Sequence, residues 1–289
     1  VRKGDKVLIE AYDVPDEMVM ELVKKVYAAG GYPFVEIFNN RVRREILKGM
    51  SEELADDMAK FAGARMDAMD AYIGIRGGNN SLELSDVPDE KMKIYDIRYS
   101  TPVHSDKRVN HTKWVILRWP TEGMSQLAKM STEGFEDFYF DVCTLDYGKL
   151  DKAMDSLKAL MDRTDKVRLI AKDTDLSFSI KNIGSVKCSG QCNIPDGEVY
   201  SAPVKDSVNG YIHYNAPSIE NGFEFKDVRL TFKDGKIIEA TANDSAACNA
   251  IFDTDEGARY VGEFAIGVNP YVTKPMGDIL FDEKIAGSI

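Results

Sequence analysis

The chain of 289 residues carries a formal net charge of −11 at pH 7, with 44% hydrophobic and 29% charged residues, which is typical of a soluble globular protein of one large or two ordinary domains. The excess of acidic residues argues against a nucleic-acid-binding surface, and no apolar run approaches the roughly 20 residues that span a bilayer. Four cysteines in so long a chain do not make a disulfide framework, so we expect reduced thiols and a cytoplasmic location.

The first half of the sequence alternates apolar runs with amphipathic segments. Val19, Leu22, Val23 and Val26 recur at helical spacing, and Ser51 is placed to cap a further helix. The expected strands between and around these helices are residues 6–11, 34–37, 71–75 and 114–117. Strands that alternate with amphipathic helices predict a doubly wound parallel sheet.

A glycine-containing segment, residues 76–80, follows the third expected strand. Open α/β sheets commonly bind ligands at such a strand end, and Gly77 and Gly78 would let the backbone approach a phosphate. Neither a GxGxxG motif nor a P-loop is present, so we favour a flexible connection. A nucleotide- or sugar-phosphate-binding α/β enzyme stays open as an alternative function.

The second half of the sequence is expected to be rich in β-strands. Aromatic and methionine side chains at helical spacing between Phe135 and Met161 predict helices that bridge to it. From Lys166 the apolar pattern changes to a period of two, and residues 233–236 have the composition of a hairpin turn. The other expected elements are strands at 167–171, 176–180 and 186–191, short helices at 244–252 and 255–261, and a strand from Gly262-Glu263.

These patterns predict an α/β protein of two domains. The first, residues 1–165, would be a Rossmann-like, doubly wound parallel-sheet domain together with the bridging helices. The second, residues 166–289, would be a β-rich α+β domain.

Two glutamates are the candidate functional residues. Glu198 follows the turn Pro195-Asp196-Gly197, and Glu263 precedes an apolar strand. Carboxylates suit a site with two divalent ions because each can bridge both cations, and such ions activate water for hydrolysis. The spacing of Glu198 and Glu263 does not by itself show that they meet.

Other candidate residues have simpler interpretations. Cys188 and Cys192 form a C-x3-C pair without two further zinc ligands, and none of His104, His111 and His213 has a second ligand at metal-binding spacing. No G-x-S-x-G segment occurs, and Ser201 has no evident base, which disfavours a serine hydrolase. Asp278, Asp282 and Glu283 are expected to form a solvated acidic turn, with support of the metal site as the alternative.

Several segments of the sequence resemble the thermophilic metallo-aminopeptidase family, which includes aminopeptidase T, aminopeptidase S and PepS. They are residues 114–121 (WVILRWPT), 131–140 (STEGFEDFYF), 193–203 (NIPDGEVYSAP), 261–270 (VGEFAIGVNP) and 277–289. The resemblance implies a metal-dependent exopeptidase with peptide substrates and a homodimer. It also implies Glu198 and Glu263 as ligands of two divalent ions of the zinc, cobalt or magnesium type, with Glu263 the better candidate to bridge them.

The sequence departs from the family pattern at its end. The family completes its site with a histidine directly after the Gly-Ser/Thr-Ile segment, a nearby tyrosine and a later His-x-Asp pair, whereas this sequence stops at Ile289. Because Val1 is not a methionine and lies immediately before a strand, we expect the chain to be truncated at both ends and to need the missing ligands for turnover. A non-catalytic, aminopeptidase-like binding or scaffold protein is the alternative.

Overall fold

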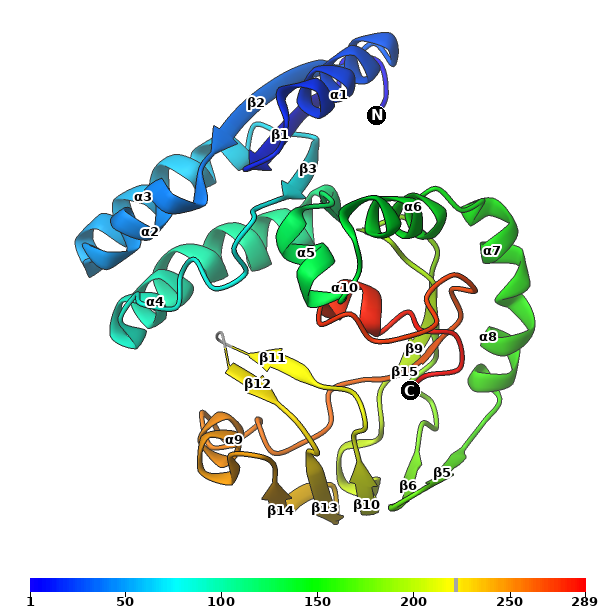
Figure 1. The fold of residues 1–289 in the computed structure, drawn as a ribbon. Coiled ribbons are helices and arrows are strands. Elements are labelled where there is room, and N and C mark those ends of the chain that lie inside the picture. The colour runs from blue at the N-terminus through cyan, green and yellow to red at the C-terminus, as the bar shows by residue number, and fades with distance from the viewer. Residues whose placement is uncertain (221–222) are drawn as a thin grey trace. The chain divides into compact units, whose positions relative to one another are not determined.

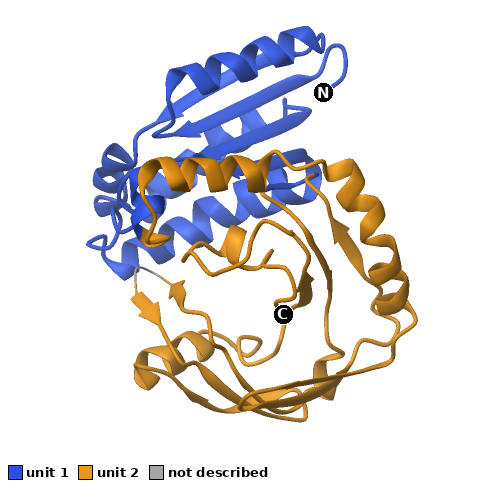
Figure 2. Ribbon diagram, turned by 45° about the vertical axis from the view of Figure 1, so that its right-hand side comes forward, with its two compact units in different colours: residues 1–126, 191–194 blue, residues 127–190, 195–289 orange. Residues whose placement is uncertain are grey.

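The computed structural model describes residues 1–220 and 223–289 (Figure 1). The chain divides into two compact units, which are coloured separately in Figure 2. Unit 1 comprises Val1–Gln126 and Gln191–Ile194, and unit 2 comprises Leu127–Gly190 and Pro195–Ile289.

Unit 1 is built on a parallel sheet in the strand order β2-β1-β3-β4-β8. Its strands are β1 (Lys6–Tyr12), β2 (Tyr32–Phe38), β3 (Ala71–Arg76), β4 (Lys113–Arg118) and β8 (Asn193–Ile194). Its helices are α1 (Asp16–Ala28), α2 (Asn40–Lys48), α3 (Glu52–Met66), α4 (Asp89–Tyr95), the π-helix η1 (Asp96–Val109) and α5 (Glu122–Leu127).

Helices cover both faces of this sheet, as the alternating pattern predicts. Val7 and Ile9 of β1 pack with Val19 of α1 on one face. Leu8 and Tyr72 pack on the other face, with Met66 of α3 and Val103 of η1. The expected cap of α3 is also present, because the Ser51 hydroxyl accepts a hydrogen bond from the Leu54 N–H at 3.2 Å. The doubly wound sheet predicted from the sequence is therefore confirmed.

The glycines after β3 are required by close packing. A Cβ on Gly77 would lie 2.4 Å from the Asp13 carbonyl oxygen, and Gly78 has a φ of +129°. The Asn40 amide donates a hydrogen bond to the Gly77 carbonyl, and the Thr121 hydroxyl donates one to the Gly78 carbonyl. These contacts explain both glycines without a phosphate ligand.

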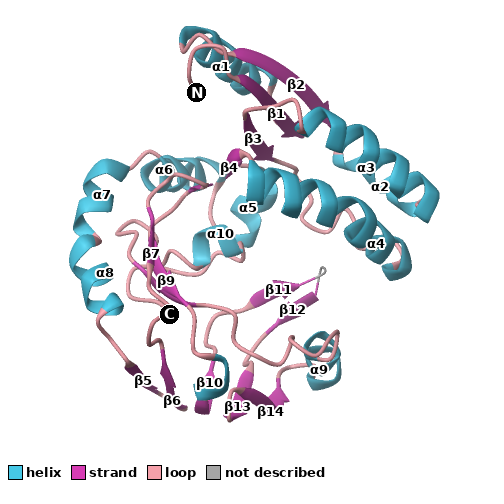
Figure 3. Ribbon diagram, turned by 180° about the vertical axis from the view of Figure 1, so that it is seen from behind, coloured by secondary structure: helices cyan, strands magenta, loops and turns pink. Residues whose placement is uncertain are grey.

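Unit 2 combines helices with antiparallel strands (Figure 3). One sheet has the order β14-β13-β10-β6-β5, a second has the order β15-β9-β7, and β11 pairs with β12. The helices are α6 (Thr132–Cys143), α7 (Tyr147–Ala153), α8 (Asp155–Asp162), the 3-10 helix η2 (Lys205–Ser207), α9 (Ser245–Phe252) and α10 (Ile279–Asp282). The strands are β5 (Lys166–Ala171), β6 (Thr174–Ser179), β7 (Val186–Cys188), β9 (Glu198–Ser201), β10 (Asn209–His213), β11 (Ser218–Glu220), β12 (Phe223–Phe225), β13 (Arg229–Lys233), β14 (Lys236–Thr241) and β15 (Phe264–Gly267).

The helices α6 to α8 belong to unit 2. Leu150 of α7 and Met161 of α8 share a buried core with Phe178 of β6 and Phe232 of β13. The division between the compact units therefore falls at Leu127, and the boundary expected near Asp165 lies inside unit 2.

The β-hairpin and one of the two short helices predicted from the sequence are present. A two-residue turn joins β13 to β14, and both Asp234 and Gly235 have a positive φ, as a type I′ turn requires. The prediction of a helix over residues 255–261 is wrong. The Asp255 carboxylate accepts hydrogen bonds from the Gly257 and Ala258 N–H groups, and this local turn replaces a helical start.

Two expected strands are shorter than the sequence pattern suggested. The strand expected over residues 186–191 ends at Cys188 as β7, before Gly190 with its φ of +83°, and β15 begins only after Glu263.

Among the described residues, no helix combines the length and the apolar character that crossing a bilayer needs.

Candidate metal centre

The turn before β9 positions the first of the candidate ligands. Gly197 has a φ of +131°, and a Cβ there would lie 2.9 Å from the Asn269 Cβ. The Asn269 side chain donates a hydrogen bond to the Asp196 carbonyl at 2.9 Å, and the Val268 N–H donates to the Gly197 carbonyl at 2.8 Å. The turn is therefore fixed against the segment that follows β15, and Glu198 begins β9 directly after it.

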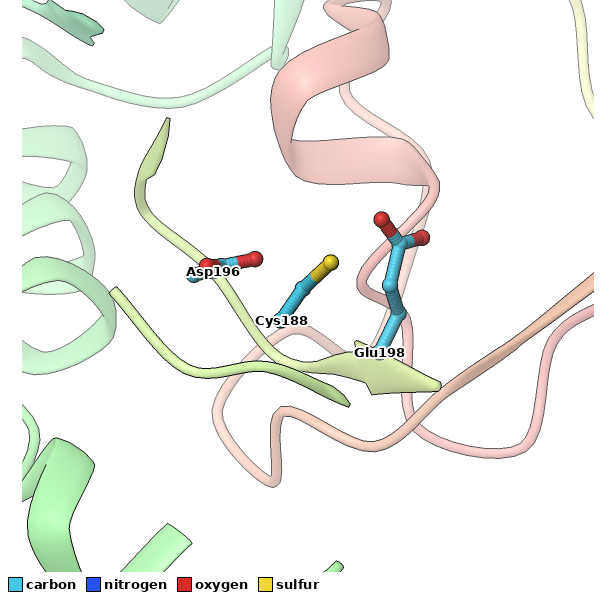
Figure 4. A group of neighbouring side chains, drawn as sticks. All are labelled: Cys188, Asp196 and Glu198. Carbon is cyan, nitrogen blue, oxygen red and sulfur yellow. The ribbon is translucent and has the colours of Figure 1, made fainter. Parts of the chain in front are cut away.

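Strand pairing brings Cys188 beside this turn. β7 runs antiparallel to β9, with Cys188 directly opposite Glu198. Cys188, Asp196 and Glu198 each offer one potential ligand atom, and these atoms lie within 4.8 Å of one another. Figure 4 shows the three side chains, with the Cys188 sulfur between the two carboxyl groups in that view. This group has the composition and spacing of a metal-binding cluster.

A fully buried lysine contacts the same carboxylates. Lys284 follows α10, and its Nζ donates to Glu198 Oε1 at 2.6 Å and to Glu283 Oε1 at 2.5 Å. Its distance to Asp196 Oδ1 is 3.7 Å. Glu198 is 5% exposed, and within the described part of the chain its Oε2 is buried without a hydrogen-bond partner. A carboxylate oxygen in that state is suited to accept a cation.

The site contains more carboxyl groups than its single lysine can neutralise. Burial raises the pKa of Glu198 to about 7, against the lowering effect of Lys284, and the charges of Glu283 and Glu263 raise it further. Burial also raises the pKa of Asp196, despite hydrogen bonds from the Gly190 and Gly197 N–H groups and the nearby Lys284. Ionised carboxylates are therefore disfavoured here unless a further positive charge arrives.

Burial has a similar effect on the Cys188 thiol. It raises the pKa of Cys188 to about 12, with further contributions from the charges of Asp196 and Glu198. Without a cation, Cys188 is therefore a neutral thiol rather than a reactive thiolate.

Glu263 lies at the other end of the β9–β15 pairing from Glu198. Glu198 is opposite Gly267, whereas Phe264, the residue after Glu263, is opposite Ser201. Glu263 is exposed and is not a member of the Cys188–Asp196–Glu198 group. Partial desolvation and the charge of Glu283 raise the pKa of Glu263, and the charge of Glu263 contributes to the raised pKa of Glu198.

The other acidic residues near the end of the chain have mainly local roles. The Asp278 carboxylate caps α10 by accepting from the Leu280 N–H, and Asp282 accepts from the N–H groups of Met276 and Gly277. Glu283 instead contacts Lys284 and so reaches the cluster. His213 lies near Asp227, with its Nε2 3.3 Å from Asp227 Oδ1, and the metal-binding group found among the described residues contains no histidine.

The sequence model of the thermophilic metalloprotease (M29) family matches residues 1–289. The chain belongs to this family. Membership implies metal ions, and the orphaned Glu198 oxygen within an acid-rich cluster fits such an ion.

Curated relatives of this M29 chain are aminopeptidases. Aminopeptidase 2 of Geobacillus stearothermophilus is 40% identical over 75 residues, which are 26% of this chain and 18% of the relative. Aminopeptidase AmpS of Bacillus subtilis is 33% identical over 106 residues, which are 33% of this chain and 26% of the relative. Aminopeptidase T of Thermus thermophilus is 32% identical over 102 residues, covering 34% of this chain and 25% of the relative.

A solved structure extends the similarity to the whole fold. The structure of wild-type AmpT from Thermus thermophilus matches with a TM-score of 0.79 over 99% of this M29 chain and 80% of that chain, at 21% sequence identity. The predicted class, a parallel-sheet α/β unit followed by a β-rich region, is therefore confirmed.

Three residues of the cluster were not predicted as ligands or as neighbours of the site. Asp196 had a sequence signal, because it lies in the same Pro-Asp-Gly turn that positions Glu198. Cys188 had only the incomplete C-x3-C pair with Cys192, and Lys284 had no signal, since their proximity to Glu198 depends on strand pairing and on the docking of residues after α10.

Proposed function

We propose that the chain is part of a metal-dependent aminopeptidase that removes N-terminal residues from peptides, with Glu198 and Glu263 as metal ligands. The observation that carries this proposal is the buried Glu198 carboxylate, whose Oε2 has no partner among the described residues of a chain that belongs to a metalloprotease family. Similarity to curated aminopeptidases supports the reaction class. The activity is proposed for the full-length protein.

The residues of the chain have distinct tasks in this proposal. Divalent ions, when bound, supply an activated water and polarise the scissile carbonyl. Lys284 holds Glu198 by its Oε1 and leaves Oε2 for an ion. Glu263 adds a second carboxylate in this proposal, which is supported by the contribution of its charge to the raised pKa of Glu198. We also propose two ions of the zinc, cobalt or magnesium type, a homodimer and a cytoplasmic location, all by resemblance to the family.

Substitution of the two glutamates tests this function. In the full-length protein, Glu198→Gln and Glu263→Gln should each lower leucyl-anilide hydrolysis by at least about 100-fold and reduce the bound metal, because each removes a charged ligand. Chelator should abolish the wild-type activity, and a divalent ion should restore it. Glu256→Gln, at an exposed glutamate of unit 2, is the matched control and should retain activity. A full-length protein that binds metal but shows no turnover on a panel of peptides would instead support the scaffold alternative.

A further inference from the structure

The position of Cys188 is set by the same strands that hold Glu198. Residues directly opposite each other in an antiparallel pair project to the same face, and Cys188 is opposite Glu198. Its sulfur and one carboxylate oxygen each of Asp196 and Glu198 lie within 4.8 Å of one another. An ion bound at the Glu198 carboxylate would therefore have a sulfur atom among its neighbours.

The carboxyl groups of the cluster outnumber its single lysine, which faces Asp196, Glu198 and Glu283. Lys284 contacts Glu198 Oε1 and Glu283, and the acidic side chains that act on Glu198 also include Glu263. Glu198 Oε2 stays buried and without a partner among the described residues. Lys284 therefore contacts only one of the two Glu198 carboxylate oxygens, and the other oxygen can bind a second cation.

We propose that Cys188 is a further ligand of the metal centre and makes it a mixed sulfur–oxygen site. This inference rests on the proposed metal-dependent function. On binding, the S–H bond of Cys188 breaks, its proton passes to solvent, and a sulfur–metal bond forms without any redox change. A thiolate favours zinc or cobalt over magnesium, because magnesium prefers oxygen ligands. The site therefore selects a borderline-soft divalent ion.

Cobalt absorption spectroscopy tests this ligand directly. The metal-free, full-length protein is titrated with Co²⁺, and the wild type should show a sulfur-to-cobalt charge-transfer band in the near ultraviolet. Cys188→Ser should lose this band while it keeps the visible bands of bound Co²⁺. Cys192→Ser removes the other cysteine of the C-x3-C pair, which belongs to unit 1, and should keep the band. Zinc affinity should fall about 10- to 100-fold in Cys188→Ser, and magnesium affinity should change little.

The outcomes separate this proposal from the proposed function. Visible cobalt bands without a charge-transfer band in the wild type would overturn the Cys188 ligand and leave a metal site of oxygen ligands. A charge-transfer band that survives in Cys188→Ser would also overturn it, because the sulfur would then come from elsewhere. A full-length protein that binds no cobalt would overturn both proposals. Cys188→Ala, which cannot ligate through a hydroxyl, checks that the loss seen with serine is due to the sulfur.

Discussion

Lys284 is fully buried, with 0% exposure, and its ammonium group stabilises the acidic cluster. Lys284→Met keeps much of the buried side-chain volume but leaves Glu198 and Glu283 without this cation. Removing one partner of a buried ion pair costs about 3–5 kcal/mol, so the metal-free variant should lose that much unfolding free energy at pH 8. The loss should be smaller at pH 5, where Glu198 protonates. Urea unfolding in chelator measures both values, with Lys274→Met at an exposed site as the control.

The same residues show how far sequence reasoning reaches. Glu198 could be singled out as a candidate because the Pro-Asp-Gly turn and the acidic residue after it are contiguous. Its buried neighbours could not, since Cys188 arrives through β7 and Lys284 through a segment far along the chain. The role of Glu263 as a ligand stays a prediction. A local motif thus indicates a candidate site, whereas the side chains that surround it depend on long-range packing.

The segment that carries Lys284 docks against β15, the strand that pairs with β9. Gly267 N–H donates to the Ser288 carbonyl, and Gly287 N–H donates to the Gly267 carbonyl. A Cβ on Gly267 would lie 2.2 Å from the Ile285 carbonyl oxygen and 2.9 Å from that of Glu283. Only a residue without a side chain allows this approach, so the sequence position of Gly267 governs how Lys284 reaches Glu198.

Gly267→Ala should therefore push the docked segment away from β15. The expected cost is about 1–3 kcal/mol of unfolding free energy, with weaker zinc binding because Lys284 no longer holds Glu198 in place. Thermal unfolding and zinc titration of the full-length protein measure these effects. Gly262→Ala is the matched control, because a Cβ there meets no atom within 4 Å. Equal stability of the two variants would show that the segment yields without consequence.

Elements with strong local signals were predicted better than those defined by distant partners. The strands β1 to β4 and the β13–β14 hairpin follow from apolar periodicity and turn chemistry. The π-helix η1 contains Pro102 and has no comparable pattern. β8 has two residues and joins the sheet only by pairing with β4, far along the chain. Such elements depend on tertiary contacts that local propensity does not encode.

On the scale of the whole molecule, acidic residues outnumber basic ones, and some carboxyl groups are buried. The net charge of −11 opposes compaction through general repulsion, whereas the buried carboxylates of unit 2 act through specific desolvation. Unit 1 also buries a glutamate, but there Arg76 and Arg108 both contact Glu10 and lower its pKa despite its burial. The Glu198 cluster has a single lysine, so the two units differ in how completely their buried acid is neutralised.

This difference predicts an unusual dependence of stability on pH. The pKa of Glu198 rises from 4.5 to about 7 on folding, so the folded protein binds the proton more tightly than the unfolded chain does. Its contribution to the unfolding free energy therefore falls as the pH rises from about 4.5 to 7, and it levels off above 7. In chelator, Glu198→Gln should therefore gain stability relative to the wild type as the pH rises through that range, on top of a constant offset from its lost ion pair with Lys284. Bound zinc should remove this gain, because the ion stabilises the ionised carboxylate of the wild type.

Thermal unfolding from pH 5 to pH 8, with chelator or with zinc, tests this dependence. High salt serves as a control, because it screens the surface repulsion far more than the interaction of buried groups. The difference in stability between the wild type and Glu198→Gln should thus persist in high salt. The pH dependence that both proteins share should become weaker. Parallel curves for the two proteins at every pH would mean that Glu198 titrates alike in the folded and unfolded states. Burial would then not disfavour the ionised carboxylate of Glu198, and the electrostatic argument for the proposed metal centre would be lost.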